Sequence, residues 1–170
     1  AYGTLLGAIR DGGLIKHDDD FDVSYISNKN KIEDVILERK EICRKLEVDG
    51  YLANVVSDAH FTANFNNSYF DITLSWQEKG FYNLYYLSFE TISIDKVLPL
   101  TSLNVFGRDF LAPKDSELVL ADIYGASWNR PIKDFSPAKN RWEVEQNFMI
   151  FRKDFDLWKP YFSKKGKDNE

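Results

Sequence analysis

Apolar positions recur with two different periods along this chain. In residues 31–48 the apolar side chains stand three and four positions apart, which is typical of an amphipathic helix. Runs rich in β-branched and aromatic residues, bounded by Gly, Asn and Ser, predict strands. Helices are expected at 3–10, 31–48, 115–123 and 139–162, and strands at 21–26, 51–57, 61–66, 69–74, 81–89, 92–98 and on both sides of Gly107 within 103–111. These elements predict an α+β fold, a mixed β-sheet with flanking helices.

Length and composition predict one globular domain. A chain of 170 residues with 44% hydrophobic residues is long enough to bury a core. The net charge of −5 argues against a nucleic-acid partner, because such a partner is usually held by a broad basic surface. The one cysteine, Cys43, cannot form an intrachain disulfide, and its helical spacing with apolar neighbours predicts a core position.

Aromatic residues dominate the last predicted helix, 139–162. They form a stripe along one side: Trp142, Phe148, Phe151, Phe155 and Trp158, together with Val144. This stripe predicts core packing or an interface, with a second domain or a membrane surface as partner. No apolar run is long enough to span a bilayer, and no signal peptide is visible. We therefore expect a cytoplasmic protein with peripheral membrane association, trimmed upstream of Ala1 because the chain starts inside a motif without Met.

A cluster of carboxylates follows the first predicted helix. Asp18, Asp20 and Asp22 are spaced two apart, so on a strand they would project from the same face. Like charges about 7 Å apart repel by roughly 2–3 kcal/mol at an effective dielectric near 20. Solvent, protonation or a bound cation can relieve this repulsion, and oxygen ligands without thiolates favour Mg²⁺, Mn²⁺ or Ca²⁺. A solvated acidic turn is the alternative interpretation.

The residues upstream of the cluster are typical of a phosphate site. Gly3 precedes Thr4, a predicted N-cap, and a helix N-terminus of this kind presents backbone N–H groups to anions. Arg10 adds a planar cation that matches phosphate oxygens. Gly12-Gly13 then turns the chain into the acidic segment. A phosphate cradle followed directly by carboxylates predicts metal-assisted phosphoryl chemistry.

A further carboxylate, Asp71, lies within the predicted strand 69–74. An acidic residue in such a β-branched and aromatic run needs a partner, unless the strand lies at an exposed edge of the sheet. The two histidines, His17 and His60, do not have the spacing of a zinc site. His60 is either a surface loop residue or part of a pocket. His17 either bonds a phosphate or an acidic neighbour, or belongs to a turn.

Taken in order, the segment Gly3–Arg10, Gly13 and the acidic run Asp18–Asp22 resemble the signature of the LicD family. That family includes the fukutin-related proteins and belongs to the nucleotidyltransferase-fold superfamily. Many members carry Pro-Trp where this chain has Lys16-His17, which leaves the carboxylates intact but changes the neighbouring pocket wall. The run from Pro113-Lys114 through Tyr124-Gly125 and Trp128 to Pro131 also resembles the family, so the resemblance covers most of residues 2–131.

The resemblance implies a nucleotidyltransferase-like fold with a catalytic core over 1–131 and an aromatic extension over 132–170. It implies that Asp20, Asp22 and Asp71 are catalytic and hold Mg²⁺ or Mn²⁺, with Asp18 as a further metal ligand. Gly3, Thr4 and Arg10 would grip phosphate. The implied reaction moves a phospho-alcohol, such as phosphocholine or ribitol phosphate, from a CDP-activated donor to a cell-surface glycan hydroxyl and releases CMP. Teichoic acid and lipopolysaccharide are acceptors of this kind.

Two alternatives keep the same fold. One is a nucleotidylyltransferase that attaches NMP from an NTP to a small acceptor, and the other is a non-catalytic glycan-binding domain. An EF-hand-like calcium loop is excluded, because Val23 stands where that loop needs Gly and Lys29 where it needs Glu. A dinucleotide site is also excluded, since no Gly-x-Gly-x-x-Gly follows a strand.

Overall fold

A computed structural model gives the fold of the chain and describes residues 2–16, 18, 20–57, 59–66, 68–84 and 88–131. The helix predicted at 139–162, and with it the extension 132–170, lies outside the described residues. The helices are α1 (Tyr2–Arg10), α2 (Ile32–Val48) and α3 (Ser116–Tyr124), with a 3₁₀ turn at Ile94–Lys96. The strands are β1 (Asp22–Ile26), β2 (Leu52–Ser57), β3 (His60–Phe65), β4 (Ser68–Glu78), β5 (Phe81–Leu84), β6 (Ser88–Ser93), β7 (Thr101–Val105) and β8 (Arg108–Ala112).

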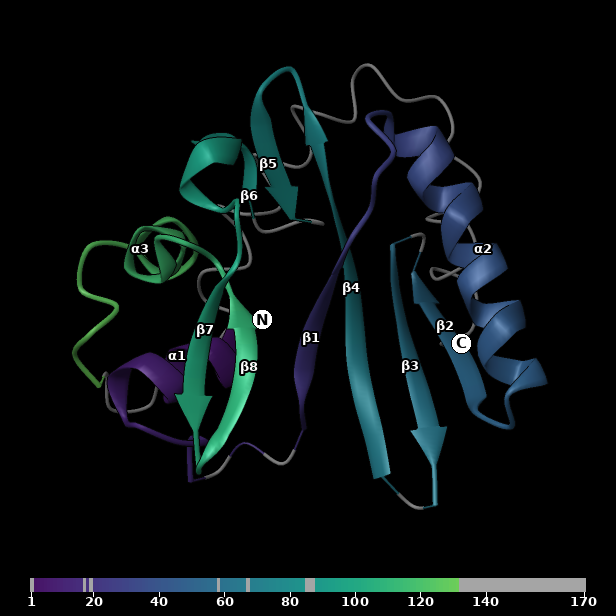
Figure 1. The fold of residues 1–170 in the computed structure, drawn as a ribbon, viewed down its shortest axis with the longest axis horizontal. Helices are drawn as coiled ribbons and strands as arrows, with labels where there is room; N and C mark the ends of the chain where they lie inside the picture. Colours follow the sequence, from purple (N-terminus) through teal and green to yellow (C-terminus); the bar gives the residue numbers. More distant parts are fainter. Residues whose placement is uncertain are drawn as a thin grey trace, which may run out of the picture. The chain divides into compact units, whose positions relative to one another are not determined.

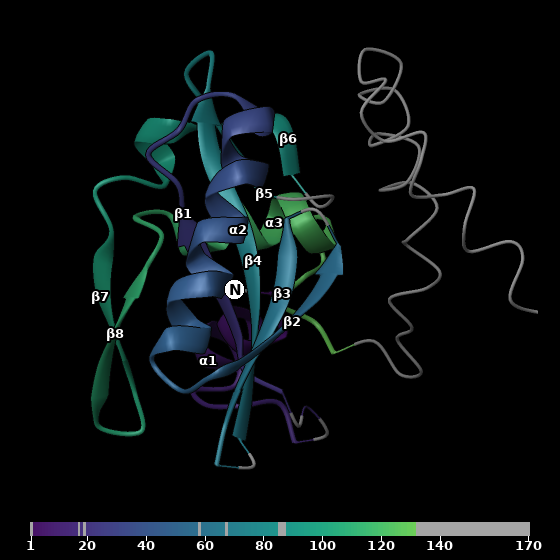
Figure 2. The same cartoon turned by 90° about the vertical axis from the view of Figure 1, so that its right-hand side faces the viewer.

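Strand β4 is the centre of a six-stranded mixed sheet. It pairs antiparallel with β3 and β5 and parallel with β1, while β2 and β6 lie at the two ends of the strand order (Figure 1). The hairpin β7–β8 forms a separate two-stranded sheet, which Figure 2 shows running alongside the main one. The prediction of an α+β fold with a mixed sheet and flanking helices is confirmed.

The face of the sheet that carries Asp71 is covered by α1 and α3. Residues of one strand alternate between faces, so the register of β4 with β5 places Asp71 and Ser75 on the same face as Tyr82 and Leu84. Those two residues pack with both helices in one core cluster. The buried members of the cluster are Leu5, Leu6, Tyr82, Leu84, Ile92, Val97, Ala112, Val119 and Leu120. Helix α2 lies instead along β2 and β4, where it buries its apolar stripe and Cys43 as predicted.

Three local predictions are wrong. The strand predicted at 81–89 is divided, because β5 ends at Leu84 and β6 begins at Ser88 and pairs back on it. The strand predicted at 92–98 is the end of β6 followed by the 3₁₀ turn. Thr4 is not an N-cap: α1 begins at Tyr2, and the Thr4 hydroxyl bonds a distant strand instead of its own helix.

Candidate active site

The three carboxylates of the acidic cluster converge in the structure. One ligand atom each from Asp18, Asp20 and Asp22 lies within 4.8 Å of the others. The strand face proposed from the sequence does not explain this, because β1 begins only at Asp22 and the other two residues precede it. The Gly12 turn, with φ +71°, and the bond from Asp18 N to Ile15 O of 2.9 Å fold this segment back. The carboxylates therefore meet through a loop that returns to the start of the strand.

The first turn of α1 lies against these carboxylates. The backbone N–H of Asp22 donates to Thr4 Oγ1 at 2.8 Å, and the N–H of Thr4 donates to Asp22 Oδ2 at 3.4 Å. A Cβ at Gly3 would stand 2.3 Å from Asp18 Oδ2, so only glycine allows this approach. The positive end of the α1 dipole thus faces the carboxylates. The phosphate contacts predicted for Gly3 and Thr4 stay predictions, and their position beside the carboxylates is compatible with them.

Asp22, the carboxylate of the cluster that begins β1, is partly buried. Burial, together with the charges of Asp20 and Asp71, raises the pKa of Asp22 to about 6, against the lowering effect of the Thr4 N–H. Carboxylates with elevated pKa values at the end of a strand are typical of sites that hold a cation or exchange a proton.

Asp71 stands beside Asp22 on the neighbouring strand. The two residues are partners in the parallel register of β1 and β4, and Asp71 N donates to Phe21 O at 3.1 Å. Strand β3 pairs with the other side of β4, where Thr62 opposes Asp71. The alternative that Asp71 occupies an exposed edge strand is therefore wrong, because β4 has a neighbour on each side at this residue.

His60 contacts Asp71 from β3. Its Nε2 lies 3.1 Å from Asp71 Oδ1, and the two side chains are 16% and 22% exposed. Of the two interpretations left open by the sequence, the surface loop is wrong, because His60 begins a strand and its side chain faces a partner. His17, like Asp19, lies outside the described residues.

Arg10 and Tyr124 lie on the α1–α3 side of the cluster. The guanidinium of Arg10 donates to both carboxylate oxygens of Asp11, through Nε at 2.8 Å and Nη2 at 2.7 Å. A phosphate would use its remaining donors or replace Asp11, so the phosphate role of Arg10 stays a prediction. Burial raises the pKa of the Tyr124 phenol, and the charges of Asp22 and Asp18 raise it further. Tyr124 therefore belongs to the electrostatic surroundings of the cluster.

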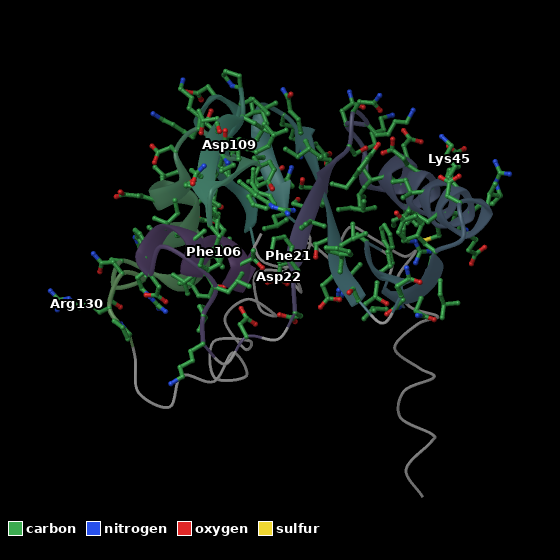
Figure 3. All side chains as sticks on the ribbon, turned by 60° about the horizontal axis from the view of Figure 1, so that its bottom comes forward. Phe21, Asp22, Lys45, Phe106, Asp109 and Arg130 are labelled. Carbon is green, nitrogen blue, oxygen red and sulfur yellow. The ribbon has the colours of Figure 1, made fainter. Side chains whose placement is uncertain are left out.

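An aromatic group beside the acidic segment was not foreseen; its member Phe70 precedes Asp71 in β4 and lies on the opposite face of the sheet. Phe21, between two acidic residues, packs against Phe70 and Phe110 with ring centroids 6.0 Å apart in both pairs. A Cβ at Gly13 would lie 2.5 Å from the ring of Phe106, the tip residue of the β7–β8 hairpin. Figure 3 shows Phe21 and Phe106 on the side of the molecule where Asp22 lies. Phe106 and Phe110 belong to the β7–β8 hairpin. No sequence motif links this hairpin to the acidic segment, so the sequence did not predict these contacts.

The donor set fits a hard divalent cation. All of the converging atoms are carboxylate oxygens, the ligands that Mg²⁺ and Mn²⁺ prefer. Oxygens bound to one octahedral Mg²⁺ are about 2.9 Å (cis) or about 4.2 Å (trans) apart, so the three carboxylates would have to draw together to bind it. The structure thus provides a group that could bind a metal, and the identity of that metal stays a prediction.

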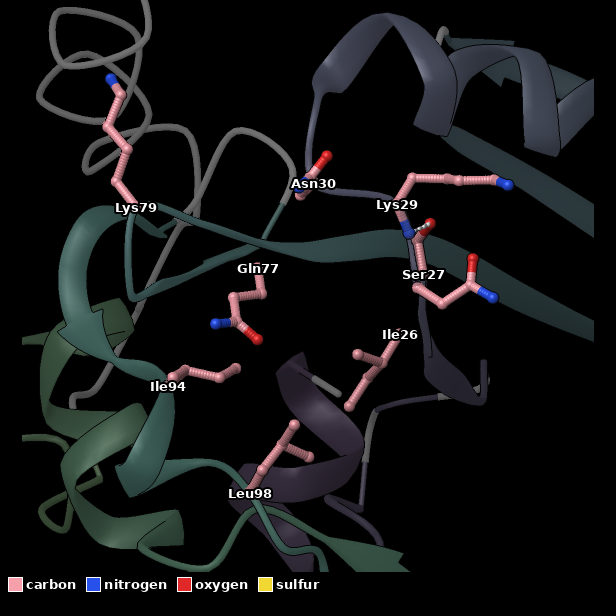
Figure 4. A pocket seen from close by; sticks show the side chains of 9 residues that line it. Ile26, Ser27, Lys29, Asn30, Gln77, Lys79, Ile94 and Leu98 are labelled. Atoms are coloured by element: carbon pink, nitrogen blue, oxygen red, sulfur yellow. Dashed lines mark hydrogen bonds between the residues drawn. The ribbon is translucent and has the colours of Figure 1, made fainter.

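A hollow elsewhere on the sheet does not compete for this role. It has a volume of about 590 Å³ and lies at the carboxyl end of β1, whereas the cluster lies at its amino end. Figure 4 shows Gln77, Ile94 and Leu98 pointing into it. Its lining contains neither carboxylates nor histidine, so it cannot form a carboxylate metal site.

Among the described helices, none has the length and apolar character to cross a bilayer.

Gly3→Ala is expected to weaken metal binding by at least about tenfold, because its Cβ must displace the Asp18 carboxylate from the cluster. The fold should be retained or stabilised, since Ala in place of Gly inside a helix gains about 0.5–1 kcal/mol. Gly7→Ala makes the same change in the same helix and is the comparison variant. Its Cβ would meet the backbone oxygen of Gly13 at 2.5 Å, so this variant should instead have a lower free energy of unfolding. Mn²⁺ titration and urea unfolding of both variants check this. Unchanged Mn²⁺ affinity in Gly3→Ala would show that the close approach has no role in the site.

This chain matches a described protein family in sequence. A family described as LicD/FKTN/FKRP, nucleotidyltransferase domain, matches residues 1–115, which is more than half of the chain. No curated protein matches the chain significantly. Among solved structures, ANT(2″)-Ia in complex with adenylyl-2″-tobramycin is 16% identical, over 86% of this chain and 76% of that chain, with a TM-score of 0.47. A likeness at that level bears on neither substrate nor mechanism.

Proposed function

The chain belongs to the LicD/FKTN/FKRP family, and from this premise we propose that it transfers a phospho-alcohol group from a CDP-activated donor to a glycan hydroxyl, releasing CMP. Membership supports a phosphotransfer or nucleotidyltransferase-like role in general, and the donor and acceptor are our proposal. The observation that carries the proposal is the convergence of Asp18, Asp20 and Asp22 within 4.8 Å beside the first turn of α1. Acidic oxygens beside a positive helix end suit a metal–pyrophosphate substrate.

In this proposal Asp20, Asp22 and Asp71 hold Mg²⁺ or Mn²⁺, with Asp18 as a further ligand. Bound there, the cation would neutralise the donor pyrophosphate and favour in-line attack, which is most of what phosphoryl transfer requires. In the proposal the first turn of α1 and Arg10 bind the donor phosphates and so orient the donor. The acceptor oxygen forms the new O–P bond while the bond to CMP breaks.

The proton of the acceptor hydroxyl goes to a carboxylate, and Asp71 is our first choice. Its Oδ1 accepts a hydrogen bond from His60, so in this proposal Oδ2 is the oxygen that takes the proton. A base must lie within hydrogen-bond reach of the proton that it removes, and Asp71 stands beside Asp22 in register. Asp71 then returns the proton to solvent.

A panel of donors tests the proposal. Purified protein is incubated with CDP-choline, CDP-ribitol or CDP-glycerol and Mg²⁺ or Mn²⁺, and CMP formation is measured with Asp20→Asn protein as the inactive control. We expect CMP from at least one CDP-alcohol and none from the control. Consumption of nucleoside triphosphates alone, with pyrophosphate release, would favour the nucleotidylyltransferase alternative that the family description also permits. No turnover of either class, with retained glycan binding, would indicate a non-catalytic domain.

A further inference from the structure

His60 acts on the site through Asp71. The first residue of β3 pairs with Thr73 of β4, so its side chain lies diagonally opposite Asp71 on the same face of the sheet. The two side chains meet at 3.1 Å, and both are largely shielded from solvent. We propose that His60 is a positioning residue that fixes the Asp71 carboxylate beside Asp22, an inference that rests on the metal site of the proposed function.

The chemistry of the contact assigns the roles of its two partners. An ionised carboxylate can only accept hydrogen bonds, so the Nε2 of His60 carries the hydrogen and donates it to Asp71 Oδ1. A nitrogen that donates a hydrogen has no lone pair for a cation. His60 is therefore a hydrogen-bond partner of a metal ligand and not itself a ligand through Nε2.

The position of Asp71 explains why it needs such a partner. Asp71 is the register partner of Asp22, and its charge is one cause of the elevated Asp22 pKa, so the two carboxylates repel each other. A free side chain would reduce this repulsion by rotating away from the cluster. The donor on β3 holds one oxygen at a defined place, and the planar carboxylate then presents the other oxygen in a defined direction.

Other contacts restrict His60 and Asp71 to this arrangement. The backbone of Asp71 is bonded to Phe21 on one side and paired with Thr62 on the other, so the strand cannot shift to adjust the carboxylate. The side-chain rotamer is then the remaining variable, and the imidazole restricts it. Partners of metal ligands that act in this way typically contribute about 10–100-fold in metal affinity.

The test is Mn²⁺ affinity in the full chain, measured without donor or acceptor by the electron paramagnetic resonance signal of free Mn²⁺. His60→Asn places its amide near the ring Nδ1, short of Asp71, and should weaken Mn²⁺ binding about 10–100-fold. His60→Gln can place an amide N–H near the original Nε2 and should stay within about threefold of the wild type. Asn64→Leu, on the same strand and the same face, is the control and should leave the affinity unchanged.

The outcomes separate positioning from simple packing. Weaker binding in His60→Asn with recovery in His60→Gln supports the proposal, because both variants carry a polar amide and differ in reach. Equal affinity in His60→Asn and wild type overturns it, as does equal loss in both variants. Thermal unfolding of each protein without metal identifies any variant that fails to fold. Because no nucleotide is present, failure of the CDP-alcohol assay would leave this result standing and would count only against the proposed reaction.

Discussion

Asp22→Asn protein is expected to lose CMP release by at least about a thousandfold, as is typical when a group central to phosphoryl chemistry is removed. Asp22 is the one residue that lies in the carboxylate cluster, bonds the first turn of α1 and pairs in register with Asp71. Asparagine keeps the shape of the side chain but removes the charge that a cation needs. Asp34→Asn, the same change at an exposed position of α2, is the control and should retain activity.

The same substitution is expected to stabilise the metal-free protein at neutral pH. Because burial raises the Asp22 pKa from 3.8 to about 6, the folded state binds a proton more tightly than the unfolded state. The tighter proton binding therefore adds to the free energy of unfolding. This contribution is complete below pH 3.8 and is lost as the pH rises through 6. Above pH 6 the ionised side chain then costs on the order of 2–3 kcal/mol, and asparagine should recover about 1–2 kcal/mol of it.

Urea unfolding in EDTA at pH 8 and pH 4 measures this difference. We expect Asp22→Asn to be the more stable protein at pH 8 and the two proteins to be nearly equal at pH 4. Lower stability of the variant at both pH values would mean that Asp22 has a structural role, and near-normal CMP release would remove Asp22 from the reaction. A residue that opposes folding and supports activity is characteristic of a functional site.

Removal of divalent cations is expected to abolish turnover and to lower the melting temperature. At a free Mn²⁺ or Mg²⁺ concentration of about 100 times Kd, binding to the folded state contributes about 2.7 kcal/mol. For a protein of this size that corresponds to a rise in Tm of roughly 5–10 °C at pH 7.5. Calorimetric scans with EDTA, with Mn²⁺ and with NaCl of equal ionic strength check the effect, and Asp22→Asn should show little of it.

The rise in Tm should be smaller at pH 5, because protons compete with the cation for Asp22. With a pKa of about 6, most Asp22 side chains are protonated at pH 5, and the metal affinity falls about tenfold, or 1.4 kcal/mol. The Tm gain should then shrink by roughly 3–5 °C. Turnover that persists in EDTA, together with equal Tm in all three solutions, would mean that the carboxylates act without a metal.

The local sequence pattern was sufficient to predict most of the helices and strands. The amphipathic helix 31–48 and the hairpin around Gly107 occur within a residue or two of their predicted ends, because their periodicity and turn residues depend only on neighbours in sequence. The strand predicted at 81–89 was wrong, since it is interrupted and returns to pair with itself, and aromatic content alone does not reveal such a break. The acidic cluster and its order after Gly3 and Arg10 were visible in the sequence, and so was the resemblance to the family.

Tertiary structure decided how these residues meet. From the sequence, Asp18 and Asp20 would share a face with Asp22 if the strand included them, whereas a returning loop brings them to Asp22, because the Gly12 turn reverses the chain before β1 begins. The position of Asp71 depends on the parallel pairing of β1 with β4, a contact between segments about 50 residues apart that no local pattern encodes. His60 was the nearest to being predictable, since a tight connection between the neighbouring strands predicted at 61–66 and 69–74 pairs it with Thr73 and places it diagonal to Asp71. The sequence by itself thus determined which groups are available for chemistry. The long-range register of the sheet decided which of them share a site, because strand pairing is set by the packing of the whole domain.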